Sequence, residues 1–209
     1  RPSCLGQVYN QIGNNNPEVE SADIFKQFLN TLIQLKNKNL IQAYHDRSDG
    51  GLITALLEMA FTVRKGLNIN LTSNQILNEA FNEEIGVLLQ ISDTDYANVI
   101  EILKNYKLEN NLKKVGEIRE DQKVIVKNSS GKEIYSKSII ELKNIWSETS
   151  YTMQKNRDNP ECAESESKLY ADQNYSGVTY QLSFDPAKPI QITKGIKPKI
   201  AIIREQGVN

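Results

Sequence analysis

The spacing of apolar residues changes along the chain from a helical period to a strand period, and this change restricts the fold more than any other feature. Between Pro17 and Lys38, apolar side chains recur every three or four residues, as on one face of an amphipathic helix. Between Lys114 and Ser136 they alternate, as in strands with one buried face. The two periods in one chain predict an α/β or α+β fold.

The predicted elements have ordinary lengths. We expect helices over residues 17–38, 52–64, 74–81, 93–106 and 138–155, and strands over residues 40–44, 67–71, 85–92, 114–118, 123–127 and 133–136. Residues 1–155 would form the main domain. Residues 156–198 are polar and interrupted by prolines, so we expect an irregular linker there. The apolar run at residues 199–203 is typical of a buried strand that needs a sheet to join, so we expect a longer parent chain.

The composition excludes several classes of function. The 209 residues include 25 basic and 26 acidic side chains, a net charge of −1, so no overall field attracts nucleic acid or an anionic membrane. No apolar run approaches the roughly 20 residues of a membrane span, and no signal-peptide pattern opens the chain, so we expect a cytoplasmic protein. With a single histidine and two distant cysteines, the usual zinc spacings cannot be built. A metal would be a hard ion on carboxylates, with Mg²⁺ as the default.

The densest chemical signal is the run Tyr44–Gly51, between a predicted strand and a predicted helix. Phosphate sites favour this location, because free amides of the first helical turn face an anion there. A glycine pair at the start of a helix suggests that a ligand or another backbone comes too close for a Cβ. In this interpretation Asp46 binds magnesium, Ser48 contacts a phosphate and Asp49 caps the helix. A capped turn without a ligand is the alternative.

Two neighbouring features carry weaker signals. His45 beside Asp46 suggests a general base, but adjacent residues of a strand point to opposite faces, so a packed histidine is the favoured interpretation. The run Phe81–Gly86 offers two adjacent carboxylates, Glu83 and Glu84, at a helix-to-strand passage. They could hold a metal or a substrate group, or simply face solvent.

Five runs of sequence, in order along the chain, resemble phosphoribosylformylglycinamidine synthase, in particular its large single-chain form. They are Gln7–Gln11, Tyr44–Leu52, Phe81–Gly86, Arg157–Cys162 and Arg204–Asn209. The resemblance covers essentially the whole chain and implies a mixed β-sheet flanked by helices, similar to the C-terminal domain of aminoimidazole ribonucleotide synthase-like proteins. It places residues 1–155 in the second synthase half and residues 199–209 at the first strand and loop of a class I glutaminase domain. Residues 1–6 keep little of the family's glycine-rich stretch, so no role is assigned to them.

The resemblance also implies an activity. Such enzymes of purine biosynthesis convert formylglycinamide ribonucleotide, glutamine and ATP to formylglycinamidine ribonucleotide, glutamate, ADP and phosphate. Their second synthase half holds an auxiliary ADP with Mg²⁺, and on this chain the resemblance makes Asp46 a magnesium ligand and Ser48 a nucleotide contact. Other domains of the parent chain would supply the remaining ligands. No catalytic residue falls on this chain, because the glutaminase triad would lie beyond Asn209.

Two further interpretations stay open. The chain could come from a relative with the same domain type, such as aminoimidazole ribonucleotide synthase or a selenophosphate-synthase-like protein, although residues 156–198 and 204–209 do not suit one. It could also be a non-catalytic structural or interaction module. Under each interpretation we expect the isolated chain to lack ligase and glutaminase activity.

Overall fold

The computed structural model describes residues 3–14, 19, 21–172, 174–188, 199 and 201. The chain divides into two compact units, Arg1–Asp172 and Gln173–Asn209. In the described part of the second unit there are turns and bends but no helix or strand. The strand and loop expected at residues 199–209 lie outside the described residues, apart from Lys199 and Ala201.

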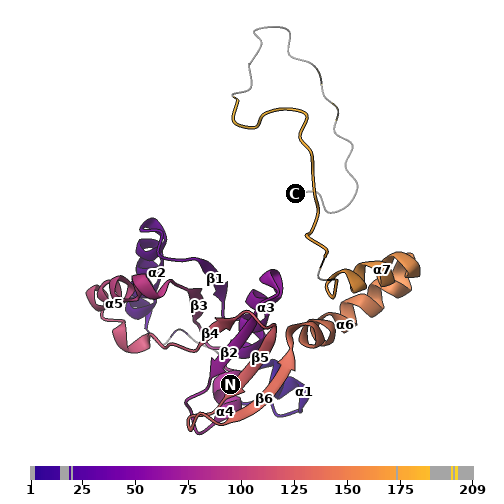
Figure 1. Ribbon diagram of the computed structural model, residues 1–209. Coiled ribbons are helices and arrows are strands. Elements are labelled where there is room, and N and C mark those ends of the chain that lie inside the picture. Colours follow the sequence, from indigo (N-terminus) through magenta and orange to yellow (C-terminus); the bar gives the residue numbers. More distant parts are fainter. Residues whose placement is uncertain are drawn as a thin grey trace. The chain divides into compact units, whose positions relative to one another are not determined.

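Every helix and strand predicted between residues 17 and 155 has a counterpart in the first unit (Figure 1). The helices are α1 (Cys4–Val8), α2 (Ala22–Asn37), α3 (Gly51–Val63), α4 (Ile76–Ala80), α5 (Tyr96–Asn105), α6 (Ile139–Arg157) and α7 (Pro160–Leu169), with 3₁₀ turns η1 (Asp93–Asp95) and η2 (Glu109–Asn111). The strands are β1 (Ala43–Asp46), β2 (Gly66–Asn70), β3 (Val87–Gln90), β4 (Gly116–Arg119), β5 (Lys123–Lys127) and β6 (Glu133–Ser138). Helices α1 and α7 and the turn η2 were not predicted.

The strands form two sheets. Strands β1 and β3 make an antiparallel ribbon in which Ala43 pairs with Gln90 and Asp46 with Val87. The other sheet has the order β4-β2-β5-β6, with β2 and β5 parallel and the outer pairs antiparallel. This is the expected mixed sheet with helices packed against it, so the predicted fold class is confirmed.

Two apolar clusters hold the first unit together. The larger joins α3 and α6 to the four-stranded sheet through residues such as Leu52, Phe61, Ile69, Val124 and Ile139. The smaller lies between α2 and α5, which run beside one another in Figure 1. Strand β3 contributes to both, because its Leu88 belongs to the larger cluster while Leu89 packs against the smaller one. The ribbon is thereby fixed from both faces.

The expectation of an irregular linker is wrong for its first part, because α6 extends to Arg157 and α7 follows it. Asn159 accepts hydrogen bonds from the backbone N–H groups of Glu161 (2.9 Å) and Cys162 (3.2 Å), and Pro160 occupies the first helical turn. An asparagine cap followed by proline starts a helix, since proline lacks only an N–H that the first turn leaves unpaired. Pro160 therefore begins an element that the sequence interpretation took it to interrupt.

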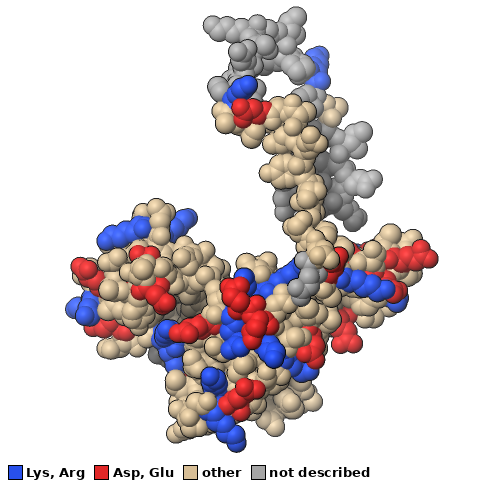
Figure 2. Space-filling model, viewed as in Figure 1, with Lys and Arg blue, Asp and Glu red and all other residues tan. Residues whose placement is uncertain are grey.

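Basic and acidic side chains are interspersed on the face shown in Figure 2, in keeping with the net charge of −1. None of the helices in the described part of the chain combines the length and the apolar character that a membrane span needs.

Candidate functional site

Strand β1 ends in the Tyr44–Gly51 motif and presents its side chains alternately to the two faces of the ribbon. The Tyr44 hydroxyl donates a hydrogen bond of 2.5 Å to Oδ1 of Asp46, two residues along and on the same face. This hydrogen bond, followed by burial and the negative charge of Asp46, raises the pKa of Tyr44 to about 12. The Asp46 carboxylate is therefore oriented by Tyr44, and its residue remains exposed.

His45 has its contacts elsewhere. Its Nε2 lies 3.0 Å from Oε2 of Glu58 on α3, and its Nδ1 lies 2.6 Å from the backbone oxygen of Asp46. Glu58 also accepts a hydrogen bond of 3.0 Å from the indole N–H of Trp146 on α6. The His45 ring thus contacts Glu58 of α3 and the backbone of its own strand, and its side chain is 28% exposed.

The glycine pair adopts left-handed backbone conformations at the start of α3. Gly50 and Gly51 have φ values of +79° and +71°, a region that favours glycine. A Cβ on Gly51 would lie 2.5 Å from the carbonyl carbon of Phe81 and 2.7 Å from the nitrogen of Asn82. Another backbone therefore comes too close to position 51 for any side chain larger than that of glycine.

The loop after α4, residues 81–86, is bound to the motif by Arg47. The backbone N–H of Arg47 donates to the carbonyl of Gly86 (2.9 Å), and its guanidinium donates to the carbonyls of Glu84 (2.6 Å) and Ile85 (3.0 Å). Burial lowers the pKa of Arg47, while the charge of Glu84 acts in the opposite direction. The guanidinium thus serves as a fixed multiple donor to the backbone of the neighbouring loop.

Glu83 is a second connection between the same two loops. Its Oε1 accepts a hydrogen bond of 2.8 Å from the N–H of Gly50 and another of 2.8 Å from the N–H of Cys4. The expected capping by Asp49 is wrong: the cap residue of α3 is Gly50, which has no side-chain cap. Because Glu83 already occupies the Gly50 amide, this N–H is not available to a phosphate. Ligand contacts at the motif must come from its side chains and the remaining backbone.

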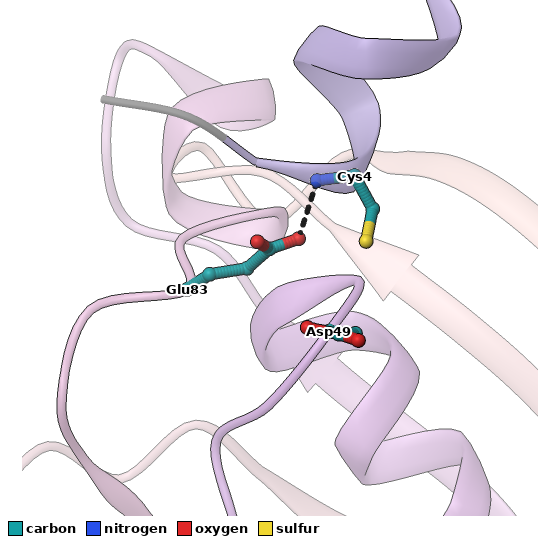
Figure 3. Close-up of side chains that lie close together, drawn as sticks. All are labelled: Cys4, Asp49 and Glu83. Carbon is teal, nitrogen blue, oxygen red and sulfur yellow. Dashed lines mark hydrogen bonds between the residues drawn. The ribbon is translucent and has the colours of Figure 1, made fainter. Parts of the chain in front are cut away.

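Figure 3 shows Glu83 together with Cys4 and Asp49, which approach one another from the loop after α4, from α1 and from the turn before α3. One ligand-type atom of each lies within 4.8 Å of the others. Burial and then the negative charge of Glu83 raise the pKa of the Cys4 thiol. The set does not suit Mg²⁺, because a hard cation prefers oxygen ligands and Oε1 of Glu83 already accepts two hydrogen bonds.

Asp46 and Ser48 suit magnesium and phosphate better. Mg²⁺ is usually bound by one or two carboxylates together with phosphate oxygens and water. Asp46 offers an exposed, oriented carboxylate, and Ser48 an exposed hydroxyl two residues further on. The Ser48 carbonyl accepts a hydrogen bond of 2.9 Å from Gly51, which fixes its backbone in the turn. One carboxylate cannot complete the coordination of Mg²⁺, so phosphate oxygens, water or other side chains would supply the remaining ligands.

Two of the connecting residues were not assigned from the sequence. Arg47 lies inside the recognised motif, yet its role depends on carbonyls 37 and 38 positions away. Cys4 had no assigned role, and its amide meets Glu83 across 79 positions. Glu83 was noticed as one of two adjacent carboxylates, but its contacts are with the backbone N–H groups of Cys4 and Gly50.

Comparisons with known proteins show which family the chain resembles. A family model described as AIR synthase related protein, C-terminal domain, matches residues 11–128. Phosphoribosylformylglycinamidine synthase of Schizosaccharomyces pombe is 43% identical over 212 residues, which cover 99% of this chain and 16% of that protein. The protein of the same name from Saccharomyces cerevisiae is 42% identical over 218 residues, again 99% of this chain and 16% of the relative.

Among solved structures, T. maritima PurL complexed with ATP has a TM-score of 0.51 at 14% sequence identity. The likeness covers 58% of this chain and 22% of that one, and it concerns the fold alone. The chain spans only 16% of the length of its yeast relatives, but its resemblance to their family is confirmed along nearly all its residues. With the family model matching more than half of its length, the chain belongs to the family of AIR synthase-related C-terminal domains.

Proposed function

We propose that this chain is part of a phosphoribosylformylglycinamidine synthase and that its Asp46–Gly51 loop contributes to an auxiliary site for ADP with Mg²⁺. The observation that carries the proposal is the exposed pair Asp46 and Ser48 on a loop held in place by Arg47 and Glu83. It occurs in a chain that is 42–43% identical, over 99% of its length, to two enzymes of that name.

In this proposal each side chain has a separate task. The carboxylate of Asp46, oriented by the Tyr44 hydroxyl, gives the metal one oxygen ligand. The Ser48 hydroxyl donates a hydrogen bond to a phosphate oxygen of the nucleotide. Bound magnesium would neutralise part of the phosphate charge. Neither residue acts as a nucleophile or a base, so the loop holds the nucleotide and stabilises the fold.

The whole enzyme would convert formylglycinamide ribonucleotide, glutamine, ATP and water to formylglycinamidine ribonucleotide, glutamate, ADP and phosphate in the cytoplasm. Other domains of the parent chain would bind these substrates and carry the catalytic residues, and residues 199–209 would open the glutaminase domain. The 209-residue chain by itself would then release no glutamate from glutamine and form no product. Glutamate release by the purified chain would contradict this part of the proposal.

The test uses the full-length protein that contains this chain, with the variants Asp46→Asn and Ser48→Ala. Each protein is purified and denatured, the released ADP is quantified, and the melting temperature is measured. Asp46→Asn removes a negative charge from a hard-cation site and should lower both the ADP content and the melting temperature. Ser48→Ala should act in the same direction but more weakly, because it loses one hydrogen bond, worth about 0.5–3 kcal/mol.

Asp49→Asn is the matched control, since it removes the same charge from the same loop at an exposed residue outside the proposed contacts. It should keep the wild-type ADP content. Stoichiometric ADP with an unchanged melting temperature in Asp46→Asn would show that the site assignment is wrong.

A further inference from the structure

Glu83 joins three segments that are distant in sequence. Its Oε1 accepts N–H groups from Cys4, the first residue of α1, and from Gly50, the residue that precedes α3. Glu83 itself stands in the loop after α4, and both hydrogen bonds are 2.8 Å long. One side-chain oxygen that accepts from two backbone donors links the start of α1 to the residue before α3.

The position of Gly50 explains why this contact matters. The N–H groups at the start of a helix have no partner within the helix, so an acceptor from outside the helix stabilises them. No side chain of the turn itself caps α3, so Glu83 supplies the acceptor from another loop. Gly50 is one residue from Asp49 and two from Ser48, so a shift of its amide moves the Ser48 backbone as well.

We propose that Glu83 is a positioning residue for the Asp46–Gly51 loop: by accepting the Gly50 and Cys4 amides it fixes Ser48 and Asp46 in the geometry that binds nucleotide. The inference rests on the proposed function for its ligand and deepens it by naming a residue that acts through the backbone. Glu83 contacts neither the metal nor the phosphate in this view, so its hydrogen-bond acceptor matters more than its charge.

Three substitutions separate the acceptor from the charge. Glu83→Gln keeps a carbonyl oxygen at the same reach and removes the charge, Glu83→Asp keeps the charge and shortens the reach, and Glu83→Ala removes both. The full-length protein is loaded with ADP and Mg²⁺, and the exchange of bound ADP with labelled ADP is followed. We expect exchange to accelerate roughly tenfold in Glu83→Ala and Glu83→Asp, and less than about threefold in Glu83→Gln, as for one or two weakened hydrogen bonds.

Two controls distinguish positioning from a general loss of stability. Val124→Ala truncates a buried side chain of β5 and should lower the melting temperature without changing ADP exchange. Glu148→Ala removes an exposed carboxylate on α6 and should change neither. Amide hydrogen exchange gives a readout without nucleotide, since Glu83→Ala should speed exchange at Cys4 and around Gly50 while the core of β5 stays protected.

The outcomes separate this inference from the proposed function. Loss of ADP in Asp46→Asn, with wild-type exchange in Glu83→Ala and Glu83→Asp, overturns the positioning role and leaves the proposed function intact. Equal damage in Glu83→Gln and Glu83→Ala also overturns it, because it would make Glu83 a direct ligand through its charge. Wild-type protein without bound ADP overturns the proposed function and this inference with it. The inference is supported if ADP exchange stays near the wild-type rate in Glu83→Gln alone and amide exchange is faster in Glu83→Ala.

Discussion

Gly51 packs against the backbone of Phe81 so closely that a Cβ on Gly51 would lie 2.5 Å from the Phe81 carbonyl carbon. We predict that Gly51→Ala destabilises the chain by roughly 2–5 kcal/mol, combining the left-handed φ of +71° with the displacement of a neighbouring backbone. Urea unfolding of the 209-residue chain measures the loss.

Gly131 provides a matched control for this substitution. Its φ is +77°, yet a Cβ there would meet nothing within 4 Å. Gly131→Ala should therefore cost only the conformational part, about 1–2 kcal/mol. Equal losses in the two variants would show that the approach of Phe81 does not matter.

Some residues of the candidate site are neighbours in sequence, whereas its connecting contacts join residues that are far apart in sequence. Asp46, Ser48 and the glycine pair stand together in one run, so residue type and spacing were enough to predict them as a candidate site. The contact of Glu83 with Cys4 spans 79 positions and joins a side chain to a backbone amide. No periodicity of side chains encodes such a contact, because any residue at position 4 except proline supplies the same N–H.

The fold shows the same limit at the boundaries of its elements. The strand predicted at residues 40–44 is found at Ala43–Asp46, because pairing with β3 decides which residues extend. Leu40 is buried as expected, but it packs in the cluster between α2 and α5 without belonging to a strand. Burial was evident from the sequence, whereas the partner of each buried residue depended on tertiary contacts.

The two cysteines of the chain should differ in reactivity. Cys4 is half-buried, and burial and the charge of Glu83 raise the pKa of its thiol, whereas Cys162 is exposed. Because the thiolate is the reactive form, iodoacetamide at pH 8 should alkylate Cys162 several-fold faster than Cys4. Peptide mass spectrometry of the 209-residue chain follows both sites at once.

Glu83→Gln tests the cause of this difference. The substitution removes the neighbouring charge while keeping an acceptor for the amides, so the Cys4 rate should rise and the Cys162 rate should stay the same. A Cys4 rate equal to that of Cys162 in the wild-type chain would contradict the prediction.

Tyr170 should anchor the end of α7 to α3. Its ring meets Phe61 edge-on, with centroids 6.5 Å apart, its hydroxyl donates to the Phe61 carbonyl (3.2 Å), and the Arg64 guanidinium lies 5.3 Å from the ring centroid. Tyr170→Ala should cost roughly 1–3 kcal/mol and speed amide exchange in α7. Tyr170→Phe should cost about 1 kcal/mol or less, because it loses one hydrogen bond.

Tyr180→Ala is the control for this truncation, since Tyr180 is 82% exposed. It should leave both the stability of the chain and exchange in α7 unchanged. If Tyr170→Ala matched Tyr180→Ala in both measurements, the ring contacts would have no anchoring role.

Glu79 should make the stability of the chain depend on pH. Burial alone would raise the pKa of this carboxyl, but the hydrogen bond from Lys113, the N–H of Ser73 (2.7 Å) and the charge of Lys113 together lower it. A lowered pKa in the folded state contributes stability above the unfolded value of about 4.3, and this contribution is lost as the pH falls through the folded value. Glu79→Gln should therefore lower the free energy of unfolding at pH 7, by on the order of 1–3 kcal/mol.

The pH dependence of the unfolding midpoint tests this prediction. Urea unfolding midpoints of the wild-type chain and Glu79→Gln, measured from pH 7 downward, should begin to converge below about pH 4.3 and should meet as the pH falls through the lower folded pKa, where the carboxyl is protonated and loses its charge-assisted bonds. Glu120→Gln is the control, since Glu120 also pairs with a lysine, Lys65, but its side chain is 82% exposed. An exposed pair contributes little, so this variant should follow the wild type at every pH. Parallel curves for the wild type and Glu79→Gln would show that the Glu79 carboxylate is not what ties α4 to the segment before β4.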